Sequence, residues 1–104
     1  MTTVVNIKHD AYDVYIGRAG KGQDGYFGNP IVRGQICSEC GRVHRFPTQT
    51  IPCYRRYFER RVVNDFTFRT RLLELRGRRI GCFCAPAPCH GNIIASWLDS
   101  LPEV

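Results

Sequence analysis

Short runs of β-branched residues alternate with helical patterns along the chain. Residues 2–7 (TTVVNI) and 13–16 (DVYI) have the composition of short strands. A third strand is predicted over residues 79–84, after which the chain turns. Residues 17–34 hold six of the ten glycines, and we predict one long loop there. A loop of this length in a small domain is usually functional or disordered.

Apolar residues at helical spacing predict three helices. The first begins near Pro52, the second is capped near Asp65 and closes at Gly77, and the last starts near His90. Their predicted core faces are Tyr54, Tyr57, Phe58 and Val62, then Phe68, Leu72 and Leu75, then Ile94, Trp97, Leu98 and Leu101. Strands that alternate with helices indicate a small α/β sheet domain.

Composition restricts the class of protein. The 104 residues are 43% hydrophobic and 12% aromatic, which favours one folded domain over residues 1–104. No stretch approaches the roughly 20 apolar residues of a membrane span, and the first residues lack the pattern of a secretory leader. We therefore expect a bacterial or infected-host cytosol, where the six cysteines act as metal ligands or reactive thiols.

The positive charge is confined to one part of the chain. Residues 42–79 hold eleven arginines and no lysine, against three acidic residues. Because guanidinium groups bind phosphate in a bidentate manner, we predict a phosphate-bearing partner. The candidate nucleic-acid contacts are Arg55, Arg56, Arg60 and Arg61, predicted as an exposed helix face. The alternative is a basic surface that serves only solubility.

Four potential metal ligands are grouped in the irregular segment of about 35–53. Cys37 and Cys40 are three positions apart and are followed by a glycine, so both thiolates can bind one ion from a tight turn. His44 and Cys53 complete a Cys₃His set. We predict one structural Zn²⁺ here, in preference to a thioredoxin-like redox pair or ordinary reduced thiols.

A second group of potential ligands follows the third predicted strand, and three interpretations are open. Cys82, Cys84, Cys89 and His90 would suffice for a second metal ion. Alternatively, Cys82 and Cys84 pack in the sheet while residues 89–92 line an anion pocket at a helix N-terminus, where a thiol has a lowered pKa. The third interpretation is core packing alone. We favour the second.

Four motifs resemble those of a family of small phage and bacterial proteins that is catalogued as a domain of unknown function. They are VYIGR (14–18), GNP (28–30), CxC (82–84) and CHG (89–91), and they span nearly the whole chain in order. The resemblance implies that the segment 35–53 is a structural insertion. It also implies a small Rossmann-like three-layer sheet domain with an inserted zinc-binding loop, by analogy of fold.

The favoured hypothesis for function is a zinc-supported α/β protein that binds a nucleotide or nucleic acid. We place an anionic ligand, most plausibly a nucleotide phosphate, near Arg18 and Asn29 from the loop, with His90, Gly91 and Asn92 from the last helix. If the second and third strands are parallel neighbours, these segments emerge at the same edge of the sheet.

Two alternatives belong to other classes. An enzyme that processes a nucleotide or modified base would use Cys89 as nucleophile and His90 as general acid or base. A host-directed interaction protein would hold an acidic protein partner with its basic helix. Phosphate-loop, dinucleotide and zinc-deaminase motifs are all missing from the sequence, which argues against those enzyme classes.

Overall fold

Three short strands form one parallel sheet in the computed structural model, which describes residues 1–20, 22–85 and 87–102. β1 (Thr3–Asn6) and β2 (Val14–Tyr15) flank β3 (Arg79–Cys82), and both run parallel to it. The carboxyl ends of all three strands therefore lie at the same edge of the sheet. This confirms the parallel arrangement on which the predicted pocket depends.

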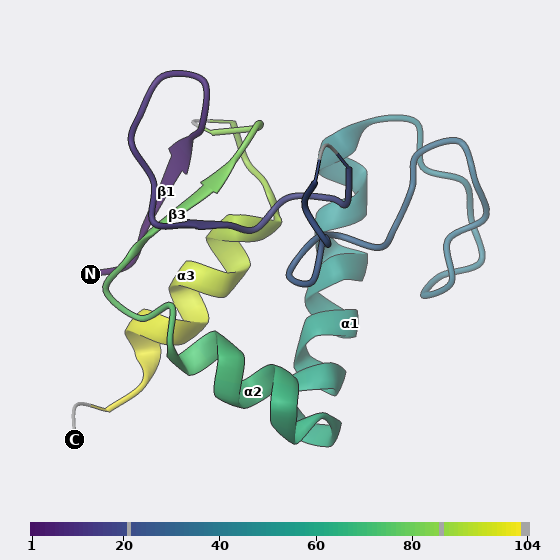
Figure 1. Ribbon diagram of the computed structural model, residues 1–104. Helices are drawn as coiled ribbons and strands as arrows, with labels where there is room; N and C mark the ends of the chain where they lie inside the picture. The colour runs from purple at the N-terminus through teal and green to yellow at the C-terminus, as the bar shows by residue number, and fades with distance from the viewer. Residues whose placement is uncertain (21, 86, 103–104) are drawn as a thin grey trace.

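Within the described residues, three α-helices and one 3₁₀ turn complete the fold (Figure 1). The turn η1 spans Pro47–Thr50 and runs directly into α1, Ile51–Asn64. α2 (Phe66–Leu73) precedes β3 in the chain, and α3 (His90–Ser100) follows it. These elements confirm the three predicted helices to within a few residues at each end.

The start and the end of α2 follow from local chemistry. The Asp65 carboxylate accepts a hydrogen bond from the Phe68 backbone N–H at 3.0 Å, which is an N-cap of the predicted kind. After α2, Gly77 has a φ of 78°, a conformation that favours glycine and turns the chain toward β3.

The sheet has a helix on one face and a loop on the other. α3 packs on β1 and β3, and it approaches so closely that a Cβ on Gly91 would lie 2.8 Å from Ile16. On the opposite face, a Cβ on Gly81 would lie 2.5 Å from Ile7 and 2.9 Å from Tyr12. The structure is thus a mixed α/β domain, but a short loop takes the place of the third layer that we expected. The loop of seven residues between β1 and β2 is too short to hold a crossover helix.

A cluster of aromatic side chains joins the three helices. Phe58 from α1 packs edge-to-face with Phe68 from α2 and with Trp97 from α3, at centroid distances of 6.0 and 5.8 Å. Tyr26 and Phe27 from the long loop also contact Phe68. The loop is therefore anchored in the core. None of the helices in the described parts of the chain is long and apolar enough to cross a membrane.

Candidate functional site

The four predicted metal ligands meet in space. The donor atoms of Cys37, Cys40, His44 and Cys53 all lie within 4.8 Å of one another. His44 Nε2 lies 3.5 Å from the sulfur of Cys40 and 3.5 Å from that of Cys53. This group can hold a metal ion, and it links a loop that extends from the domain to the first turn of α1 (Figure 1).

Backbone hydrogen bonds shape the turn that presents the first two ligands. The Cys37 N–H donates to the Arg42 carbonyl, and the Gly41 N–H donates to the Cys37 carbonyl, both at 2.8 Å. Gly41 has a φ of 75°, so a residue without a side chain is favoured there. The glycine after Cys40 therefore has the role that the sequence predicts for it.

The environment of these thiols separates their pKa values. Burial acts to raise the pKa of Cys37, but N–H groups of Cys40 and Glu39 point at the sulfur and lower it to about 6. Cys53 is buried without such donors, and burial raises its pKa to about 11. One thiolate is thus stabilised by the turn itself. A second thiolate beside it would add a like charge, and a cation at the centre of the group would offset that repulsion.

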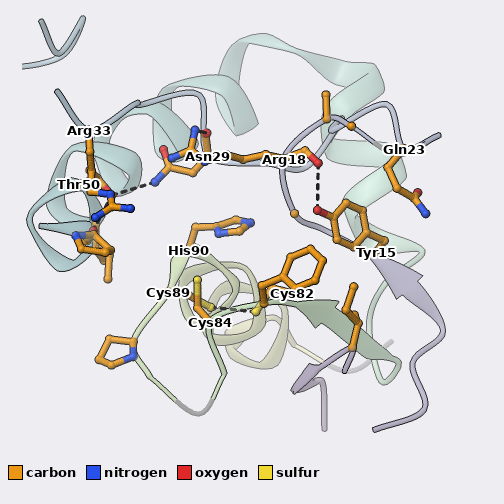
Figure 2. A pocket seen from close by; sticks show the side chains of 18 residues that line it. Tyr15, Arg18, Gln23, Asn29, Arg33, Thr50, Cys82, Cys84, Cys89 and His90 are labelled. Carbon is orange, nitrogen blue, oxygen red and sulfur yellow. Dashed lines mark hydrogen bonds between the residues drawn. The ribbon is translucent and has the colours of Figure 1, made fainter. Parts of the chain in front are cut away.

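A pocket of about 650 Å³ opens at the carboxyl edge of the sheet. Four of the residues predicted from sequence line it: Arg18, Asn29, Cys89 and His90. Figure 2 shows His90 between Asn29 on one side and the cysteine sulfurs on the other. The structure therefore brings residues of the long loop and of the start of α3 together at one pocket, and ligand binding there stays a prediction.

The imidazole of His90 is held in one orientation. Its Nε2 lies 2.6 Å from the Ile16 carbonyl oxygen, and because a carbonyl only accepts, Nε2 carries the proton. Burial lowers the pKa of His90 and outweighs the hydrogen bond to the Ile16 carbonyl, which acts to raise it; the nearby charge of Arg18 adds to the lowering. His90 lines the pocket, and Nδ1 is the ring nitrogen that the bond to Ile16 leaves for a ligand. His90 presents a neutral acceptor nitrogen there.

Three sulfurs lie beside this histidine. Cys82 and Cys89 are buried with their sulfurs 3.4 Å apart, and Cys84 is exposed. A hydrogen bond from the Cys89 thiol lowers the pKa of Cys82 to about 6. The same bond raises the pKa of Cys89. The thiol with the lowered pKa is therefore Cys82, whereas from the sequence we expected a lowered pKa at Cys89.

The second predicted metal site is not assembled. Within the described part of the chain, the group around His44 is the one whose donor atoms approach closely enough for an ion. His90 turns its Nε2 to the Ile16 carbonyl, although Cys82, Cys84 and Cys89 lie nearby. The three cysteines of this region line the pocket.

Arg18 and Asn29 have structural partners as well as a place in the pocket. Two nitrogens of the Arg18 guanidinium donate to the carbonyls of Asn29 and Ile31, each at 2.5 Å. The buried Asn29 amide donates to Thr50 Oγ1 at 3.0 Å and its oxygen accepts from the Ile31 N–H. These bonds hold the long loop against η1.

Gly91 and Asn92 do not line the pocket, contrary to the expectation from sequence. Gly91 faces the sheet, and its N–H lowers the pKa of the neighbouring Cys89. Asn92 caps α3, because its side-chain oxygen accepts from the Cys89 N–H at 2.9 Å. The N-terminus of α3 is thus occupied by its own cap.

Several lining residues were not found from sequence. They come from four separate segments: Tyr15, Gln23, Arg33, Thr50 and Phe83. Arg33 is exposed, and its side chain has no hydrogen bond or ion pair within the described residues. Figure 2 places Arg33 and Tyr15 at opposite ends of the pocket.

The basic face predicted on α1 is only partly exposed. Arg55 and Arg56 are exposed, whereas Arg60 forms a two-point ion pair with Glu39 at 2.7 and 2.8 Å. Arg61 differs from the expectation, because it is half-buried with its guanidinium 3.9 Å from the Phe68 ring centre. Nucleic-acid binding by this helix stays a prediction that rests on two free arginines.

These features define a small α/β domain with a Cys₃His cluster and a pocket at the carboxyl edge of its sheet. The chain belongs to the family described as domain of unknown function DUF4326, which matches residues 4–100. This confirms the family class expected from the motifs.

One curated relative comes from a phage. The "Uncharacterized 12.4 kDa protein in nrdA-td intergenic region" of Enterobacteria phage T4 is 41% identical over 51 residues. That match covers 49% of this chain and 47% of the phage protein, so the chain spans about half the length of this relative. No solved structure matches the chain.

Proposed function

We propose that the pocket at the carboxyl edge of the sheet binds a mononucleotide. The observation that carries this proposal is the charge of the lining. Arg18 and Arg33 are there, and no acidic residue is among the described residues that line the pocket. The volume of about 650 Å³ lies in the usual range for small-ligand pockets.

The two ends of the pocket suit the two ends of a nucleotide. Arg33 offers an exposed guanidinium, a group that binds phosphate through two parallel hydrogen bonds. At the other end, Tyr15 and the half-exposed Phe83 pack edge-to-face at 6.1 Å. An exposed aromatic ring is a platform on which a base stacks. His90 Nδ1, between them, accepts a hydrogen bond from a base or a ribose hydroxyl.

Calorimetric titration with nucleoside monophosphates and the matching nucleosides tests this proposal. We expect the monophosphates to bind more tightly, and Arg33→Gln to weaken their binding about tenfold or more, because it removes a charge-assisted contact. Arg55→Gln is the matched control, since it removes the same charge from outside the pocket. Equal affinity for nucleosides and monophosphates would contradict the phosphate assignment.

The metal that best suits the Cys₃His group is zinc. Three thiolates and one imidazole form a donor set typical of structural zinc sites. With Zn–S and Zn–N bonds of ordinary length, a sulfur and a nitrogen on one tetrahedron lie about 3.6 Å apart. The two distances of 3.5 Å from His44 Nε2 to the sulfurs of Cys40 and Cys53 fit that value.

Native mass spectrometry of the purified protein, before and after chelation, tests the identity of the metal. We expect one zinc per chain, removed by a strong chelator. An iron-sulfur cluster or a metal-free protein after purification in zinc-containing medium would refute the assignment. The role we propose is structural, because all four coordination positions are taken by side chains of this chain.

A further inference from the structure

The thiols at the end of β3 have a chemistry that nucleotide binding does not use. Cys82 ends β3 and Cys89 is the N-cap of α3, and their sulfurs lie 3.4 Å apart in the wall of the pocket. A disulfide bond needs the sulfurs only about 1.3 Å closer. Two thiols at contact distance in a pocket form a dithiol pair.

We propose that Cys82 and Cys89 reduce an anionic low-molecular-weight disulfide that enters the pocket. The proposal does not depend on nucleotide binding. The substrate class follows from the chemistry of the lining. A thiolate beside a second thiol exchanges with a sulfur–sulfur bond without any further reagent, so a disulfide is the oxidant that we propose. The arginines of the pocket, with no acidic residue among its described lining, favour one that carries carboxylates or phosphates.

The reaction has two balanced steps. The Cys82 thiolate attacks one sulfur of the disulfide RSSR, so that a Cys82–SR bond forms and RS⁻ leaves with the electron pair of the broken bond. Cys89 then loses its proton, and its thiolate attacks the Cys82 sulfur and expels the second RS⁻. The two thiols of the protein are oxidised by two electrons, RSSR is reduced by two, and their two protons end on the two RSH products.

The surroundings of the two sulfurs explain the order of attack. The Cys89 thiol donates to the Cys82 sulfur, and N–H groups of Cys84 and Ala85 support the same charge, so the pKa of Cys82 is lowered. The hydrogen bond to Cys82 is in turn the main cause that raises the pKa of Cys89, followed by burial and by the Cys82 charge. When Cys82 becomes a neutral mixed disulfide, its charge and the hydrogen bond to that charge disappear. The N–H of Gly91 at the helix N-terminus then favours the Cys89 thiolate.

The third thiol of the region, Cys84, is a competitor that the structure distinguishes from Cys82. The residue is exposed, but partial desolvation of its sulfur, together with the Cys82 charge, raises its pKa. Cys84 therefore stays protonated at neutral pH and reacts slowly, although it is the most accessible of the three.

Oxidised glutathione is the probe for this proposal, with the metal-loaded full chain and Cys84→Ser as the starting protein. We expect release of two equivalents of glutathione and a Cys82–Cys89 disulfide, seen by non-reducing peptide mapping. Adding Cys89→Ser should stop the reaction after the first step. One glutathionyl group then stays on Cys82, with one equivalent released.

Adding Cys82→Ser instead should abolish both products. Should that variant fail to fold, the trapped adduct in the Cys89→Ser protein still identifies the attacking sulfur. An adduct on Cys89 with Cys82 unmodified would overturn the proposed order. A glutathionyl group that persists on Cys82 while Cys89 is present, or no reaction at all, would overturn the dithiol. Neither result bears on the monophosphate titration.

Discussion

The two cysteine clusters contain the same kinds of residue, but their histidines have different partners. His44 turns its Nε2 to the sulfurs of Cys40 and Cys53, at 3.5 Å from each. His90 turns its Nε2 to the Ile16 carbonyl, at 2.6 Å. A nitrogen that donates to a carbonyl carries a proton and has no lone pair for a metal. His90 keeps a second ring nitrogen, so the spacing of the donor atoms separates the two clusters: those of the first lie within 4.8 Å of one another, and those of the second form no such group in the described part of the chain.

The two clusters also differ in what surrounds them. The first lies in a loop with little core of its own, where Ile36 and Phe46 are 77% and 62% exposed. The second lies against the sheet, beside the fully buried Ile16 and Ile80. A loop that buries so little apolar surface needs another source of stability, and a metal ion supplies it. The sheet needs none, which leaves its cysteines available for chemistry.

The largest effect should come from removing one ligand of the first cluster. We expect Cys40→Ser to lower the metal content by one ion per chain. It should reduce the free energy of unfolding by about 4 kcal/mol, as loss of a metal site does. Hydrogen exchange should rise over residues 35–50, while the strands remain protected. Metal analysis and exchange mass spectrometry measure both effects.

Cys84→Ser is the matched control for that variant, because it changes the same residue type in the other cluster. We expect its metal content and stability to equal those of the parent protein. If Cys84→Ser also lost an ion, the second cluster would bind metal and the contrast between the two histidines would fail.

A smaller effect should come from the bonds that join the two regions. Asn29 lies in the pocket and donates to Thr50, just before the helix that supplies Cys53. Asn29→Ala should destabilise the protein by about 1–3 kcal/mol, because it leaves buried polar partners unpaired. Gln23→Ala, on the exposed pocket wall, should cost less than about 0.5 kcal/mol. Urea unfolding measures the free energy of unfolding of both variants. Equal losses would show that the Asn29 hydrogen bonds do not stabilise the contact between the pocket and α1.

Sequence reasoning succeeded where the chemistry is local. The metal ligands fall within 17 positions, from Cys37 to Cys53, so their spacing alone indicates the cluster. The helix starts are likewise set by nearby residues such as Asp65. The cap of α3 could also have been found, since Asn92 stands three residues after Cys89 in the pattern of a capping box.

Sequence reasoning failed for side chains whose surroundings come from distant segments. The exposure of Arg61 depends on Tyr26, which is 35 positions away and accepts a hydrogen bond from its guanidinium. Helical periodicity describes one helix and contains nothing about the loop that covers it. The same holds for Arg33, which reaches the pocket through the path of the long loop. The partner of His90 is also a backbone carbonyl, which no residue pattern reveals.

The smallest effect should come from the pH dependence that His90 contributes to stability. Burial lowers its pKa in the folded state below the ordinary value of 6.5, so the unfolded chain binds more protons near that pH. Its contribution is therefore fully present above about pH 6.5 and is lost as the pH falls through the folded pKa. In His90→Gln, the free energy of unfolding should therefore decrease less steeply as the pH is lowered below 6.5.

Both proteins in this last comparison should carry Cys82→Ser, because the pKa of Cys82 is lowered to about 6 and its thiol would titrate in the same range. Urea unfolding at a series of pH values gives the two curves, and their difference isolates the imidazole. An unchanged slope in His90→Gln would mean that His90 takes up a proton as readily in the folded protein as in the unfolded chain. Burial would then not hold the ring neutral. Nδ1 would carry a proton in part of the folded molecules near pH 6.5, and in those molecules it could not accept a hydrogen bond from a ligand in the pocket.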